Sequence, residues 1–128
     1  MEFRSDIPIY LQLMKQVKLQ IVSGKLKPGE KLLSVRDLAI EYGVNPNTMQ
    51  KALSELESEQ LLYTVRTTGR YVTEDVVRLQ AIRGELAQER VRTLFAELKD
   101  LGYSKEEIEQ LLERYLREMT EHDTVSTV

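Results

Sequence analysis

The chain has 128 residues, 41% of them hydrophobic and 30% charged, which suits one compact domain or a small domain with a helical appendage. The absence of cysteine excludes disulfides and thiol catalysis, and the single histidine excludes Ser-His-Asp triads and multi-histidine metal sites within one chain. The acidic N-terminus lacks the apolar core of a signal peptide, and no apolar run is long enough to span a bilayer. We therefore expect a cytoplasmic protein with no membrane partner, no cofactor, no metal and no enzymatic activity.

Charge is distributed unevenly between the two halves of the chain. The net charge is −3, which by itself disfavours a nucleic-acid partner. However, residues 1–73 hold ten Lys or Arg against eight Asp or Glu, whereas residues 74–128 hold eight against thirteen. A slightly basic front half joined to an acidic back half is compatible with DNA binding by the front half.

The first helix is predicted to begin at Pro8, which is tolerated in a first turn, and to end at Gly24. Between them, apolar residues recur at a spacing of four and define one buried face: Ile9, Leu13, Val17 and Ile21. The lysines of the following loop are expected only to aid solubility: Lys25, Lys27 and Lys31.

Two short helices follow, separated by about four residues. Ser34 is a suitable N-cap for the first of them, and Tyr42-Gly43 ends it. Asn45 caps the second helix, and Pro46 occupies its first position. This spacing is typical of a helix-turn-helix. The second helix is expected to bury one face: Met49, Ala52, Leu53 and Leu56.

A β-hairpin is predicted next, from strand-like runs at 61–65 and 70–73 that flank a tight turn at 66–69. Three helices followed by a hairpin make a winged helix. The predicted fold class is therefore α+β, with an N-terminal winged helix-turn-helix followed by a two-helix C-terminal dimerisation segment.

The back half is predicted to form two amphipathic helices separated by Gly102. Ser104 and Glu107 form a capping box for the second of these helices. The two apolar stripes have little to bury them within one chain, and a symmetric partner would solve this. The residues expected in dimerisation are Leu94, Phe95, Leu98, Leu101, Ile108, Leu111, Leu112, Tyr115, Leu116 and Met119.

Polar side chains at the start of the second helix of the pair suit base recognition in the major groove. The residues expected to contact DNA are Arg36, Asn45, Asn47, Thr48, Gln50, Lys51, Arg66, Thr68, Gly69 and Arg70. Tyr10 could add a phosphate contact, although a half-buried core role is favoured for it. Arg36 could instead pair with Asp37 or Glu41, and the two wing arginines could belong to an ordinary basic hairpin.

Several segments together resemble the GntR family of bacterial regulators. They are Pro8-Ile9-Tyr10-Leu11-Gln12, the run from Ile21 to Gly29, the run from Leu33 to Ala39, and the run from Gly43 to Leu53. The chain departs from the family pattern at three places. Leu33 stands where proline is usual, Gln60 stands where glycine commonly ends the recognition helix, and the wing keeps only Gly69 of a Gly-x-Gly-Thr pattern.

Only about 55 residues follow the wing, which resembles the short YtrA-type subgroup whose C-terminal helices serve dimerisation. The resemblance implies a winged-helix domain at 1–73, a dimerisation domain at 74–123 and a polar tail at 124–128. It also implies a homodimeric transcription regulator, a repressor by preference, that binds double-stranded DNA at a palindromic operator, for example of a transporter operon. A small-molecule effector is left open.

Two other interpretations remain at this stage. A winged helix can serve as a protein-interaction module, which the net negative charge would suit. The chain could also be the head of a regulator cut from a fused catalytic domain, although the capped last helix argues against that. A steep salt dependence would separate DNA binding from an apolar protein interface.

Overall fold

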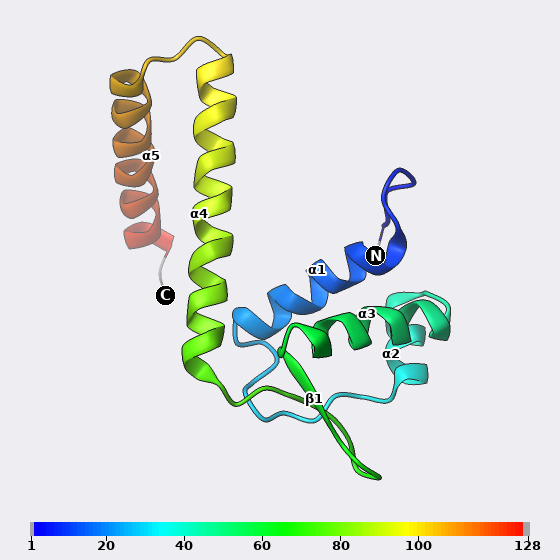
Figure 1. Ribbon diagram of the computed structural model, residues 1–128. Helices are drawn as coiled ribbons and strands as arrows, with labels where there is room; N and C mark the ends of the chain where they lie inside the picture. The colour runs from blue at the N-terminus through cyan, green and yellow to red at the C-terminus, as the bar shows by residue number, and fades with distance from the viewer. Residues whose placement is uncertain (1, 127–128) are drawn as a thin grey trace. The chain divides into compact units, whose positions relative to one another are not determined.

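The computed structural model describes residues 2–126, within which five helices and two strands follow one another along the chain (Figure 1). Their bounds are α1 Ile9–Val22, α2 Val35–Tyr42, α3 Pro46–Ser58, β1 Leu62–Val65, β2 Gly69–Val72, α4 Val76–Asp100 and α5 Lys105–Ser126. The chain divides into two compact units, one ending at Gly84 and one starting at Glu85. The first unit therefore reaches beyond residue 73 and includes the first turns of α4.

The first unit is built on α3, which packs against α1, α2 and β1. The predicted inner face of α3 is confirmed, since all four of its apolar residues are buried. On α1, Leu13, Val17 and Ile21 are buried, whereas Ile9 is 43% exposed, so the buried stripe begins one turn later than expected. The core is completed by the following residues: Leu32, Leu38, Ala39, Leu61, Leu62, Val72 and Leu79.

Local capping signals fix where α2 and α3 begin. The Ser34 hydroxyl accepts a hydrogen bond from the amide of Asp37 at 3.1 Å, and Gly43 ends α2 with φ 69°. The Asn45 side-chain oxygen accepts from the amide of Asn47 at 2.7 Å, and Pro46 occupies the first position of α3. Each cap satisfies one of the backbone donors that a helix start leaves unpaired. The predicted helix-turn-helix is thus confirmed.

Gln60 ends α3 in a strained conformation. Its φ of 64° lies in the left-handed region, which is unfavourable for a residue with a β-carbon. Glycine adopts this conformation at little cost, which explains why glycine is the usual residue at this place in the sequence pattern. Its neighbour Glu59 receives two hydrogen bonds on its carbonyl oxygen from the Arg78 guanidinium, at 2.9 and 3.2 Å, which tie the start of α4 to the end of α3.

The wing is an antiparallel hairpin with Leu62 opposite Val72 and Val65 opposite Gly69. Its base is buried through Leu62 and Val72, and its outer face carries the stacked rings of Tyr63 and Tyr71, 5.6 Å apart. The loop after α1 adds a third segment to the free edge of β2. Lys31 pairs with Tyr71, and the amide of Leu32 donates to the carbonyl of Arg70 at 2.9 Å. The sequence did not predict this pairing.

The second unit consists of the later part of α4 and of α5, which turns back after residues 101–104 (Figure 1). The capping box is confirmed, because Ser104 and Glu107 exchange hydrogen bonds of 2.9 and 3.1 Å. The helix α5 continues to Ser126, into the expected polar tail, whose residues 127 and 128 lie outside the described residues. No helix in residues 2–126 combines the length and apolar content needed to cross a bilayer.

Candidate nucleic-acid interface

The exposed start of α3 carries the side chains that the sequence assigned to base recognition. Asn47 and Gln50 are exposed and Thr48 is half-buried. The Gln50 amide nitrogen lies 3.2 Å from the Ser54 hydroxyl, so its carbonyl oxygen is left to accept from a ligand. Asn45 differs from these, because its side-chain oxygen already caps α3. Its amide nitrogen keeps two donors, so the primary role that the structure shows for it is structural.

Lys51 and Tyr10 lie together between α3 and α1. The Lys51 ammonium stands 4.0 Å from the centroid of the Tyr10 ring, within the range of a cation–π interaction. Tyr10 is half-buried and packs against the core, which is the role that the sequence favoured for it. The two expected contact residues therefore form one contact of their own, and Lys51 is held near the recognition helix.

Arg36 projects from the first turn of α2 and is exposed. The structure gives it no ion pair with Asp37 or Glu41, both of which had been weighed as partners. The exposed Arg66 and Thr68 stand at the tip of the wing, where Thr67 takes a positive φ of 66° to close the turn. The exposed guanidinium groups of Arg36 and Arg66 are available to a ligand.

Arg70 was expected to be a free cation beside the wing tip, but the structure places its side chain elsewhere. Thr64 and Arg70 face each other across the hairpin, on the same side as the buried Leu62 and Val72. The Arg70 side chain is only 15% exposed, and its guanidinium lies 3.6 Å from the Glu57 carboxylate on α3. The pleat of the strand turns this side chain toward the recognition helix rather than outward.

The backbone conformation of Gly69 favours glycine at this position. Its φ is 141°, a conformation that side chains rarely adopt. A β-carbon at this position would lie 2.9 Å from Cε of Lys31, and the flexible end of that side chain would have to move away. Gly69, which was expected to approach DNA, thus lies beside the Lys31 side chain, a neighbour that the sequence did not indicate.

Two tyrosines near these surfaces have perturbed acidities. Desolvation raises the pKa of Tyr42 above its ordinary value of 10, with Glu41 adding to the effect. Desolvation, followed by Glu74 and Tyr71, raises the pKa of Tyr63 as well. Both phenols therefore stay protonated at neutral pH and can act as hydrogen-bond donors, not as charged groups.

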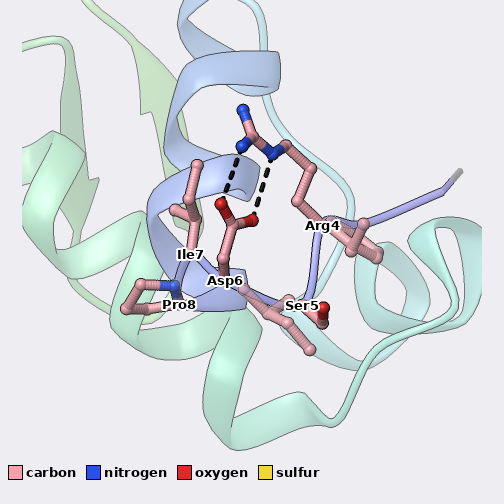
Figure 2. Close-up of a pocket in the computed structure, with 7 residues that line it drawn as sticks. Arg4, Ser5, Asp6, Ile7 and Pro8 are labelled. Carbon is pink, nitrogen blue, oxygen red and sulfur yellow. Dashed lines mark hydrogen bonds and ion pairs between the residues drawn. The ribbon is translucent and has the colours of Figure 1, made fainter.

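The N-terminal arm forms a separate hollow that is lined by residues 3–9 (Figure 2). Figure 2 shows the Arg4 guanidinium facing the Asp6 carboxylate, with hydrogen bonds of 2.7 and 3.1 Å. The Gln12 side chain holds the arm by bonding to the backbone of Arg4 and Ile7. Since the charge of Arg4 is neutralised locally, we do not assign the arm to the interface.

The fold and the exposed polar start of α3 define a winged helix-turn-helix protein. The family model of bacterial regulatory proteins of the gntR family matches residues 9–72. The chain belongs to this GntR family.

Relatives match well beyond the winged helix. YhcF, an HTH-type transcriptional regulator of Bacillus subtilis, is 37% identical over 84% of this chain and 88% of its own. The HTH-type transcriptional repressor YtrA of the same organism is 38% identical over 86% and 83%. These matches are too long to be confined to the winged helix, and they support the YtrA-like short subgroup that the sequence indicated.

Solved structures agree with this assignment. A GntR family transcriptional regulator from Listeria monocytogenes is 39% identical, with a TM-score of 0.80 over 88% of this chain and 98% of that one. AraR(DBD) in complex with operator ORR3 is 33% identical, with a TM-score of 0.51 over 57% of this chain and 86% of that one. The latter similarity therefore concerns about half of the present chain.

Proposed function

We propose that this protein is a homodimeric transcription regulator, a repressor by preference, that binds a palindromic operator in double-stranded DNA. The observation that carries the proposal is the start of α3, where the exposed Asn47 and Gln50 and the half-buried Thr48 present hydrogen-bonding groups. Such side chains match the donor and acceptor pattern of base edges in the major groove. The similarity to AraR(DBD), which is seen with an operator, supports the same partner.

The C-terminal unit supports dimerisation. Between residues 85 and 121, whose side chains the structure describes, only Ile108 is buried, at 3% exposed, while large apolar side chains remain between 38% and 72% exposed. The exposed members of the expected set are Leu94, Phe95, Leu101, Leu112, Tyr115, Leu116 and Met119. Contiguous apolar surface of this kind marks an association site, and a second copy would complete a helical bundle. Ile108 itself is already buried within its own chain.

A two-fold dimer implies a two-fold operator. Each recognition helix would enter a major groove, with the two half-sites about one helical turn apart. We extend the proposal to a cytoplasmic location and to a transporter operon, the latter on the resemblance to the YtrA-type subgroup alone. An effector, if the protein has one, would bind at the dimer cleft.

The test is a pull-down of fragmented genomic DNA with the purified chain, followed by a salt titration on the most enriched fragment. We expect a short palindrome whose affinity falls steeply with salt, because phosphate contacts release counterions. If no sequence is enriched at low salt, the chain alone does not bind an operator and the proposal fails as stated; the winged helix then meets a protein or needs an effector before it can bind DNA.

A further inference from the structure

A groove of about 410 Å³ separates the wing from the recognition helix within the first unit. Gln50 on α3 stands on one side of the groove, and Thr64 and Thr68 on the wing stand on the other. The segment between the wing edge and α2 closes its floor with residues 31–35, and Gly69 and Arg70 complete it. The groove thus runs between the two elements that were assigned to DNA.

The shape of duplex DNA indicates what this groove would hold. If α3 lies in a major groove and the wing in the neighbouring minor groove, one sugar-phosphate strand must pass between them. The groove between Gln50 and Thr68 is where that strand would run. This step rests on the proposed function, since it needs α3 and the wing to bind one duplex.

The lining of the groove is suited to an anion. No carboxylate lines it, although the whole chain carries a net charge of −3. It has two cationic side chains, Lys31 and Arg70. Arg70 is paired with Glu57, whereas the structure gives Lys31 no ion pair with any described residue. Lys31 therefore carries the uncompensated charge of this groove.

The backbone of Lys31 is also held in place before any ligand arrives. Its backbone pairs with Tyr71, and the flanking bonds run from the Leu32 amide to Arg70 and from the Val72 amide to Glu30, each 2.9 Å. Its exposed side chain then lies beside Gly69 on the wing. Because the backbone of Lys31 is already ordered by the strand pairing, binding need not order it.

We propose that Lys31 binds a phosphate of the DNA strand that runs between α3 and the wing. A solubilising loop lysine, which was the sequence-based interpretation, needs no strand pairing that fixes its backbone beside the groove. Because a phosphate contact carries no sequence information, Lys31 contributes affinity and salt dependence but no operator preference.

The test compares Lys31→Gln with Lys25→Gln in the full chain. Both variants remove one exposed positive charge, but Lys25 does not line the groove. Two labelled duplexes of about 30 base pairs serve as probes, one of random sequence and one from the genomic pull-down, titrated between about 50 and 200 mM salt. Thermal unfolding of each variant checks that the fold is intact.

For Lys31→Gln we expect the slope of log K against log salt to fall in magnitude by about 0.9 for each bound copy. At 0.1 M salt this corresponds to a loss of about eightfold in affinity per copy, equal for both duplexes. Lys31→Arg should restore the slope, and Lys25→Gln should keep it.

The first contrary outcome is that wild type binds both duplexes and that Lys31→Gln and Lys25→Gln have the same salt slope. In that case Lys31 does not bind a phosphate, although the protein still binds DNA. If wild type binds neither duplex, the proposed function itself fails, and the phosphate site fails with it. A loss confined to the selected duplex would also overturn the proposal, because it would show that Lys31 reads bases.

Discussion

The Arg70 guanidinium on the wing lies 3.6 Å from the Glu57 carboxylate on the recognition helix α3. The Arg70 side chain is 15% exposed and the Glu57 side chain 33% exposed. Water and salt therefore screen the attraction between these two charges less than they would at the free surface. This ion pair joins the two elements that would enter neighbouring grooves of DNA. The pair therefore contributes to the relative placement of the wing and α3, while Arg66 is left as the free arginine of the wing.

Replacing Arg70 by Ala should destabilise the fold more than it changes direct DNA contact. Removal of the guanidinium leaves the partly buried Glu57 carboxylate without its partner, which should cost about 1–3 kcal/mol in the free energy of unfolding. Urea denaturation measures this change. Arg66→Ala is the control, with an expected change within about 0.5 kcal/mol because its side chain is exposed. Equal stabilities for the two variants would contradict the structural role of Arg70.

Gln60→Gly should stabilise the protein. The left-handed φ of 64° costs a residue with a β-carbon about 1–2 kcal/mol, and glycine escapes this cost while adding some entropy to the unfolded chain. We expect a net gain of about 0.5–1 kcal/mol, seen as a higher midpoint in urea denaturation.

A control for this change keeps the β-carbon. Gln60→Ala retains the strain, so its midpoint should stay near that of wild type or fall below it. An Ala variant as stable as the Gly variant would show that the Gln60 side chain, and not its backbone conformation, is what destabilises the end of α3.

Much of the fold follows from signals that are local in the sequence. The caps at Ser34 and Asn45 and the capping box at Ser104 each involve residues two or three positions apart, and all three occur as predicted. The inner face of α3 follows from helical periodicity in the same way. The wing strands occur where they were predicted: β1 begins one residue later and ends at Val65 as expected, and β2 lies one residue earlier.

The interface was less predictable because it depends on contacts between distant segments. Alternation along a strand gives two faces, but the sequence does not say which face meets α3, so Arg70 could not be paired with Glu57 in advance. Lys31 is 38 residues from Gly69, and nothing local in the sequence indicates that its loop joins the edge of the wing. Ile108 was counted with the open stripe for a similar reason, although it is buried within its own chain.

Arg36→Ala should weaken operator binding by about 1–3 kcal/mol if the guanidinium makes a bidentate contact with DNA. The Arg36 side chain is exposed and has no ion-pair partner among the described residues, so the substitution breaks no ion pair within the protein. Fluorescence anisotropy on the duplex from the genomic pull-down measures the change. Arg83→Ala on α4 removes the same charge from an exposed position outside the candidate interface. If the two variants bind equally well, Arg36 does not belong to the site.

Leu112→Asp should separate the dimer into monomers. Leu112 lies on the exposed apolar stripe of α5, at 38% exposed, and the proposed partner would bury it. Burying an unpaired carboxylate costs several kcal/mol, which is large compared with the net stability of most associations of small helical units. Sedimentation equilibrium at a series of protein concentrations gives the mass directly.

The matched control is Gln110→Asp, which introduces the same carboxylate on α5 two residues away and at an exposed position. Because neighbours two apart on a helix do not share a face, this charge should remain in water and the dimer should persist. Far-UV circular dichroism should show equal helix content in both variants, since each places one aspartate in the interior of α5. A Leu112→Asp variant that still sediments as a dimer would move the interface away from this stripe, whereas loss of the dimer in both variants would point to a general effect of charge on α5.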